Sequence, residues 1–197
     1  MDLAEKKIGF ALTGSHCTLA KVIPAIEELV DLGADVQPIF SEALRRDSTR
    51  FGTPKGWEEQ IVGITGKNIL TTIPEVEPIG PQKLLDILIV APCTGNTVAK
   101  IANGITDTVV TMAIKAHLRN KRPVVLAVAT NDALGNNAKN IGVVINTPNI
   151  FLAPLGQDNP TGKPNSLVAR MDLIVETAQY AVEGRQLQPV IIEYKGL

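Results

Sequence analysis

The sequence predicts an α/β fold with a central, mostly parallel sheet. Three short apolar runs carry this prediction, at residues 7–13, 86–90 and 123–129. Each run leads into a turn of small and polar residues, and a segment with helical spacing follows. Apolar strands of this kind are typical of a parallel sheet that helices cover on both faces. The polar turns would then lie at the carboxyl edge of the sheet, where such folds bind ligands.

The first unit begins with the strand 7–13. A helix with regularly spaced apolar residues follows over 19–30, and Gly33 is a suitable C-terminal stop. Gly14 permits a tight turn between them, and Ser15 could help the free N–H groups of the helix hold a phosphate. The turn lacks the GxGxxG spacing of a dinucleotide site.

The second strand, 34–41, is expected beside the first through a right-handed crossover. Its last residue, Ser41, would therefore lie at the same edge of the sheet as the first turn. Beyond it, residues 42–53 show little periodicity, and residues 54–62 predict a short helix. The Pro-rich stretch 74–81 predicts a surface loop.

The polar turn after the strand 86–90 is the longest of the three. Thr94, Asn96 and Thr97 supply hydroxyl and amide groups at the start of the next helix. The free N–H groups and the positive dipole end of a helix N-terminus favour an anion. The same side chains would also serve as ordinary helix caps. The residue types alone leave both interpretations open.

The helix predicted over residues 109–118 is apolar on nearly every face. Such a helix is buried in the core or packed in a subunit interface, so we predict a homo-oligomer. The strand 123–129 follows, and Thr130-Asn131-Asp132 forms a further polar cluster at its end. The next segments are predicted to be a weak helix over 133–141, a short strand over 142–146 and a final strand over 149–154.

The last third of the chain contains a candidate lid. The loop 155–166 is rich in turn residues, which is typical of a mobile loop at a binding site. A final helix is predicted over 167–184, closed by Gly184. The tail 189–194 is β-prone and could pair with another element or with another chain.

Composition limits the classes of function. The 197 residues, 45% of them hydrophobic, suffice for a sizeable core in a single domain over 1–197. A net charge of −1 with scattered Lys and Arg argues against binding nucleic acid or anionic membrane. The sequence contains no apolar run of membrane-spanning length and no signal-peptide pattern at its start, so we expect a cytoplasmic protein. Cys17 and Cys93 are interpreted as reduced core residues rather than a redox pair. No metal-ligand pattern is present, and no metal is expected.

Two adjoining motifs, residues 92–97 and 99–107, resemble the FMN-binding flavoprotein family. That family includes phosphopantothenoylcysteine decarboxylase, the lantibiotic cysteine decarboxylases and the flavin prenyltransferases. The resemblance extends to residues 13–15, to Ser41 and to residues 169–171, so it covers most of the chain. It implies a flavodoxin-like three-layer sandwich, assembly as trimers or larger multiples, and FMN as the cofactor.

The resemblance also implies roles for individual residues. Those expected to hold FMN are Gly14, Ser15, Ser41, Thr94, Asn96, Thr97, Ala129 and Thr130. The catalytic residue is open, with His16, Asn96 and Asn131 as candidates. For an anionic substrate, the candidate cations are Lys163 and Arg170, with Lys100 as a further one.

One departure from the family pattern concerns histidine. The decarboxylases of the family place a catalytic histidine after the second strand, whereas residues 41–85 contain none. This absence argues against cysteine decarboxylation. His16 lies in the first turn instead, where it could donate to a phosphate or carboxylate, titrate near neutral pH, or act as a polar cap. His117 lies on the apolar helix and is interpreted as structural.

Within the family, the segments 13–18, 130–135, 156–158 and 163–166 resemble one component of a two-component oxidoreductase. This implies the oxidation of a small planar dicarboxylate ring. The partner protein would carry its own dinucleotide-binding domain and NAD(P). Two alternatives are an independent FMN-dependent decarboxylase or prenyltransferase, and a non-catalytic binding or scaffolding subunit.

Overall fold

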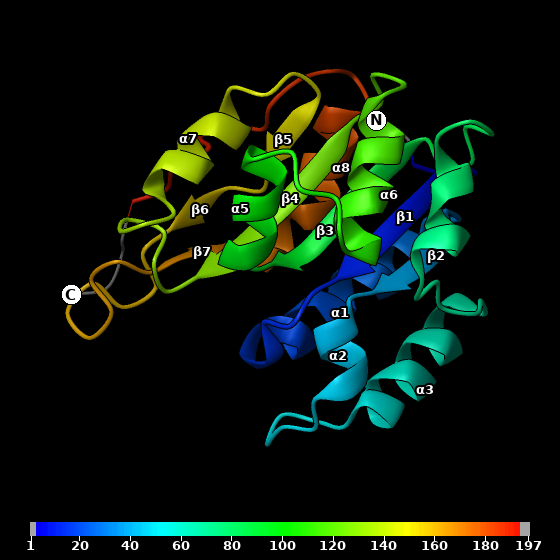
Figure 1. The fold of residues 1–197 in the computed structure, drawn as a ribbon, viewed down its shortest axis with the longest axis horizontal. Helices are drawn as coiled ribbons and strands as arrows, with labels where there is room; N and C mark the ends of the chain where they lie inside the picture. The colour runs from blue at the N-terminus through cyan, green and yellow to red at the C-terminus, as the bar shows by residue number, and fades with distance from the viewer. Residues whose placement is uncertain (1–2, 194–197) are drawn as a thin grey trace.

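The computed structural model describes residues 3–193 and contains a seven-stranded sheet (Figure 1). Its parallel centre has the order β2–β1–β3–β4, and β5 lies beside the first half of β4. The strands are β1 (Lys7–Leu12), β2 (Asp35–Phe40), β3 (Ile87–Cys93), β4 (Val124–Thr130), β5 (Ile150–Leu152), β6 (Leu155–Gly156) and β7 (Leu167–Ala169). The predicted central strands are confirmed, because their apolar runs are the buried strands β1 to β4.

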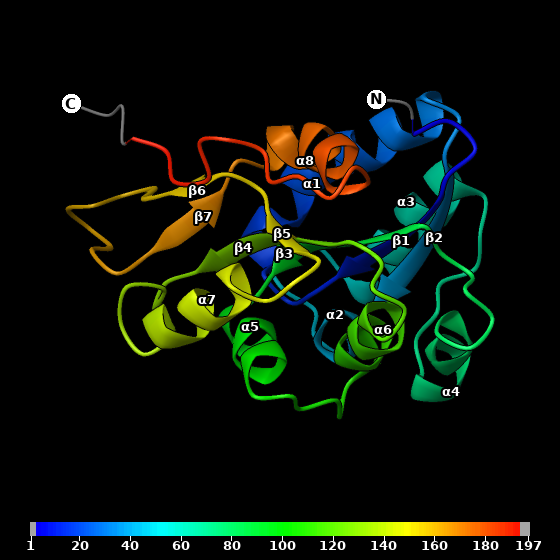
Figure 2. The same cartoon turned by 90° about the horizontal axis from the view of Figure 1, so that it is seen from above.

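Helices cover both faces of this sheet. Figure 2 shows α1 and α8 on one face and α5, α6 and α7 on the other. The helices are α1 (His16–Asp31), α2 (Glu42–Arg46), α3 (Pro54–Thr65), α4 (Ile73–Val76), α5 (Gly95–Ala102), α6 (Val109–Leu118), α7 (Ala138–Ile145) and α8 (Ile174–Ala181), with the 3-10 turns η1 (Glu77–Ile79) and η2 (Met171–Leu173). The predicted flavodoxin-like three-layer sandwich is confirmed.

Two different strands pair with the same edge of β4. Its first half pairs in parallel with β5, where Val124 lies opposite Ile150. Its second half pairs antiparallel with β7, where Ala129 lies opposite Val168, and β7 pairs antiparallel with β6. Both ends of the segment 155–166 are therefore anchored beside the carboxyl end of β4.

Three predictions about the last third of the chain are wrong. Residues 142–146, expected as a strand, mostly belong to α7, because their buried positions recur at helical spacing. The weak helix expected over 133–141 begins only with α7. The helix expected over 167–184 begins only at Ile174. Its first residues form β7 instead, because pairing with β4 satisfies their backbone groups although their apolar spacing also suits a helix.

Other segments agree more closely with expectation. Residues 54–62 lie in α3, and residues 149–154 contain β5. The stretch 74–81, expected as a loop, contains part of α4 and η1, because proline in a first helical turn loses no helical hydrogen bond. The tail pairs with another element as expected, since Leu155 forms a bridge with Ile191. Tyr194, at the end of the predicted tail strand, lies outside the described residues.

The apolar helix α6 buries most of its surface within the chain. Seven of its ten residues are buried, and it packs against β2, β3 and β4. His117 on this helix is fully buried, with its Nε2 3.1 Å from the carbonyl oxygen of Pro123. Burial lowers the pKa of His117 from 6.5 to about 4, so the imidazole is neutral near pH 7. These contacts support the structural interpretation of His117.

Acid should destabilise the fold through His117. The unfolded chain binds a proton near pH 6.5 and the folded chain only near pH 4, so stability falls as the pH drops between these values. From pH 7 to pH 5, the free energy of unfolding should decrease by about 2 kcal/mol through this group. Urea unfolding at both pH values measures the change. His117→Gln should reduce it. Equal pH dependence in this variant and in the wild type would contradict the assignment.

Candidate functional site

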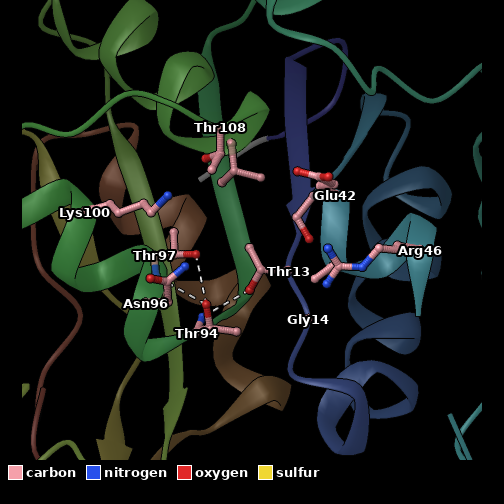
Figure 3. Close-up of a pocket in the computed structure, with 12 residues that line it drawn as sticks. Thr13, Gly14, Glu42, Arg46, Thr94, Asn96, Thr97, Lys100 and Thr108 are labelled. Atoms are coloured by element: carbon pink, nitrogen blue, oxygen red, sulfur yellow. Dashed lines mark hydrogen bonds between the residues drawn. The ribbon is translucent and has the colours of Figure 1, made fainter. Parts of the chain in front are cut away.

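The sheet order reverses between β1 and β3, because the chain leaves β1 for β2 and then returns to the other side of β1. The crevice outside the carboxyl ends of the strands at such a point is the usual ligand site of open α/β sheets. A cavity of about 360 Å³ lies there, and we call it the switch-point cavity (Figure 3). It brings together six polar or small residues from three strand ends: Thr13, Gly14, Ser41, Thr94, Asn96 and Thr97.

Thr13 joins the ends of β1 and β3 at the floor of this cavity. Its buried hydroxyl donates to the carbonyl oxygen of Pro92 at 2.6 Å and accepts from the N–H of Thr94 at 3.1 Å. The hydroxyl of Thr94 in turn accepts from the N–H of Thr97 at 3.3 Å and so caps α5. The N–H groups of Gly95 and Asn96 have no acceptor among residues 3–193. Helix capping and an open donor site therefore coexist at this N-terminus.

Two buried polar atoms near the first two strand ends lack a partner in the described part of the chain. They are the Oγ of Ser41, which lines the cavity, and the Nδ1 of His16. Gly14 lies close to the start of α2, since a Cβ at this position would be 2.9 Å from the Cβ of Ala43. A side chain at residue 14 would therefore force the two loops apart.

The cations at the switch-point cavity already have carboxylate partners. Arg46 pairs with Asp47 at 2.8 Å, and Lys100 pairs with Asp107 at 2.6 Å. Hydrogen bonds from these cations hold the pKa of Asp47 and of Asp107 below the usual range. Glu42 adds a negative charge to the wall. The cavity thus offers mainly hydroxyl and amide donors.

A second cavity, of about 260 Å³, lies between the start of α1, the end of β4 and the segment 155–166, and we call it the lid cavity. Ala129, Thr130 and Asn131 line it from β4. Ser15, Cys17, Thr18 and Lys21 line it from the turn before α1 and from α1 itself, and Asp158 and Lys163 line it from the lid segment.

The lid segment is tied to the end of β4. The fully buried Ser166 donates from its Oγ to the Oδ1 of Asn131 at 3.4 Å, and Lys163 lies 3.5 Å from Asp158. Burial favours the neutral form of Asp158, but the hydrogen bond from Ser166 and the charge of Lys163 outweigh it and lower the pKa of this carboxyl. Asp158 is therefore ionised at neutral pH.

A hydrogen-bonded network connects the end of β4 with the start of α7 and packs against the start of α5. The carboxylate of Asp132 accepts from the hydroxyl of Thr130 and from the side-chain amide of Asn137, the latter at 2.8 Å. Asn137 continues the network, accepting from Asn140 at 2.8 Å. These groups press against Gly95, where an added Cβ would clash with the hydroxyl of Thr130. Glycine at residue 95 thus lets α5 start directly on this network.

The residues proposed from the sequence divide between the two cavities. Gly14, Ser41, Thr94, Asn96 and Thr97 line the switch-point cavity together with Lys100, and Ser15, Ala129, Thr130, Asn131 and Lys163 line the lid cavity. His16 begins α1 and lines neither cavity. Arg170 also lines neither, and its guanidinium pairs with the exposed Asp172.

Sequence reasoning missed several of the residues that line the two cavities. Thr13 and Arg46 line the switch-point cavity, and Lys21 and Asp158 line the lid cavity. One signal was available for Lys21, because it lies four residues after Cys17 and so shares its face of the helix. Arg46 lies on a short helix that the irregular stretch 42–53 did not predict.

The two cysteines differ in environment. Both are free thiols, but Cys17 is exposed at the start of α1 and Cys93 is buried, so the interpretation as a core residue is wrong for Cys17. Burial raises the pKa of Cys93, so this thiol stays protonated and behaves as a small core residue. Residues 3–193 contain no group of three or more His, Cys, Asp or Glu that could hold a metal ion, and none of their helices is long and apolar enough to span a membrane.

The fold is a flavodoxin-like α/β sandwich, and the Flavoprotein family model matches residues 1–179, so the chain belongs to this family. Along its length, it is similar to the B subunit of dipicolinate synthase from Bacillus subtilis, with 49% identity over 196 residues, 99% of this chain and 98% of that protein. The crystal structure of the B subunit of dipicolinate synthase from Bacillus halodurans superposes with a TM-score of 0.90 at 48% identity, covering 98% of this chain and 99% of the other.

More distant structures share the fold alone. The FMN-dependent cysteine decarboxylase SpaF superposes with a TM-score of 0.64 at 21% identity, over 91% of this chain and 98% of the other. Since the match to the dipicolinate synthase protein is both higher in identity and closer in structure, the decarboxylase interpretation is the weaker one.

Proposed function

We propose that the chain is the B subunit of a dipicolinate synthase, which acts with the A subunit of that enzyme to oxidise dihydrodipicolinate to dipicolinate during sporulation. The observation that carries this proposal is the identity of 49% over 196 residues with a protein of that name. The oxidation removes two electrons and two protons from the ring, and NAD(P) on the A subunit is the electron acceptor. The test is formation of dipicolinate by the purified chain mixed with its A subunit.

The switch-point cavity is the proposed FMN site. Membership of the Flavoprotein family supports this, and the residues present fit the group. The unpartnered hydroxyl of Ser41 and the open N–H groups of Gly95 and Asn96 suit the polar chain and phosphate of a flavin nucleotide. Bound FMN supplies reversible two-electron transfer. Ser15, Ala129 and Thr130 belong to the adjoining lid cavity and would contact the ring end of the cofactor.

The residues of the chain have separate roles in this proposal. Asn131 and Lys163, at the lid cavity, bind and orient the anionic substrate. Asn96 holds the cofactor through its amide, and His16 remains a candidate proton donor beside the first turn. Arg170 pairs with Asp172 at the surface and is the weaker candidate for a substrate cation. Closure of the segment 155–166 over the lid cavity excludes water.

Asn96→Asp should weaken FMN binding by about tenfold or more. The substitution places a carboxylate at the start of α5, beside the phosphate of the proposed site, and like charges repel most strongly where water is excluded. FMN fluorescence titration measures the affinity. Asn68→Asp makes the same change at an exposed position outside both cavities and should bind FMN as the wild type does. Unchanged affinity in Asn96→Asp would show that the phosphate lies elsewhere.

The wider organisation is proposed on the same basis. The chain forms one domain and assembles as a homo-oligomer, a trimer or a multiple of it, in the cytoplasm of the mother cell. A groove between α5 and α6 that contains Ile101, Ile105 and Ile114 supplies apolar surface suited to such an interface.

A further inference from the structure

We infer that the lid cavity is a carboxylate-binding subsite in which Lys21 of α1 meets one carboxylate of a small planar dicarboxylate. This rests on the proposed function for the identity of the ligand. The choice of Lys21 as the cation rests on the lining of the cavity. The family resemblance implies no role for α1 beyond its first turn.

Charge distinguishes the lid cavity from the switch-point cavity. Lys21 makes no ion pair or hydrogen bond with any residue from 3 to 193. Lys163 and Asp158 supply one positive and one negative charge to the same walls, so Lys21 leaves the cavity with a net positive charge. In the switch-point cavity, both cations already have carboxylate partners. An added carboxylate therefore gains more from the lid cavity.

The lid cavity already holds one carboxylate of the chain itself. Asp158 pairs with Lys163 at 3.5 Å, and both members of this pair are partly exposed. A pair of this length and exposure is weak, so a ligand carboxylate can join or replace Asp158 at Lys163. A dicarboxylate would then span Lys21 and Lys163, one carboxylate on each.

Size and the other donors agree with this ligand class. A volume of about 260 Å³ is slightly below the usual range for drug-sized ligands and suits a single six-membered ring with two carboxylates. The side chain of Ser15 does not cap α1, since it accepts from the hydroxyl of Thr18 at 2.7 Å instead. The hydroxyl proton of Ser15 and the side-chain amide of Asn131 remain as neutral donors that can orient the ring.

Calorimetric titration of the full chain with dipicolinate tests the subsite. Lys21→Ala should weaken binding by about tenfold, and Lys21→Arg should restore most of it, since a cation at this position is what the site requires. Lys139→Ala removes an exposed lysine from α7, away from both cavities, and should bind as the wild type does. The affinity for picolinate, which has one carboxylate, should fall less in Lys21→Ala than the affinity for dipicolinate.

The inference would be overturned if Lys21→Ala bound dipicolinate as tightly as the wild type, or if Lys21→Ala and Lys139→Ala lost the same affinity. It would also be overturned if the wild-type chain did not bind dipicolinate. Kinetics of the chain mixed with the A subunit separate this result from the fate of the proposed function. Lys21→Ala should raise KM for dihydrodipicolinate about tenfold with little change in kcat. If the wild-type mixture forms no dipicolinate, the proposed function fails, whatever the titration shows.

Discussion

The purified chain should form no measurable dipicolinate from dihydrodipicolinate and NAD(P), and activity should appear only when the A subunit is added. The sequence contains no GxGxxG turn after a strand. In its first turn, Gly14 lines the switch-point cavity and Ser15 lines the lid cavity instead. Residues 3–193 therefore contain no glycine-rich turn of this kind that could bind the pyrophosphate of a dinucleotide tightly. We therefore expect the partner to hold the electron acceptor.

The assay follows the ring absorbance of dipicolinate for each protein by itself and for the mixture. A useful control adds FMN to this chain without the partner, because a flavin reoxidised by oxygen could give slow turnover in its absence. Turnover by this chain and NAD(P) equal to that of the mixture would make the chain the complete catalyst. No activity in the mixture would leave the scaffolding or decarboxylase alternatives.

Gly95→Ala should damage both stability and FMN binding. Its Cβ would clash with the Oγ1 of Thr130 and would lie 2.8 Å from the Nδ2 of Asn137 and 3.0 Å from the Oδ1 of Asp132. These atoms belong to short side chains held in one network, so α5 must shift or the hydrogen bonds of Asp132 must break. Either response should cost about 2 kcal/mol of unfolding free energy. It should also displace the open N–H groups of the switch-point cavity.

Gly63→Ala is the matched control. Gly63 lies inside α3, and apart from its chain neighbours and the nearby backbone of the same helix, no described atom lies within 4 Å of the position that a Cβ would take there. Alanine at this position should leave FMN binding unchanged and stabilise the helix by about 0.5–1 kcal/mol. Urea unfolding and FMN titration of both variants measure the two effects. Wild-type stability and affinity in Gly95→Ala would mean that the network does not position α5.

The strand ends and the turns that follow them could be predicted because their signals are local. A buried apolar run and a polar turn are visible within about ten residues, and parallel strands bring their carboxyl ends to one edge. Gly14, Ser41 and Thr94 were expected at that edge on these grounds, and the structure places them around one cavity. The burial of His117 could also be predicted, because the helix that contains it is apolar on nearly every face.

The lid hairpin could not be predicted in this way. Residues 167–169 have an apolar spacing that suits a helix, yet they form β7, because the second half of β4 leaves an edge of unpaired backbone groups once β5 has ended. That edge is created by residues far away in the sequence. The same pairing carries Asp158 and Lys163 to the end of β4, where the lid cavity forms.

Local pattern thus determined the class of fold, the positions of the central strands along the chain, and the polar turns at the carboxyl edge of the sheet. Tertiary contacts decided that these turns serve two cavities, that Lys21 faces one of them, and that Gly95 must be glycine. The physical reason is that hydrophobic periodicity and turn chemistry act over a few residues. Three features depend on groups that come together only when the chain folds. They are the pairing of strands at a shared edge, the direction in which a helix face points, and the space available for a Cβ.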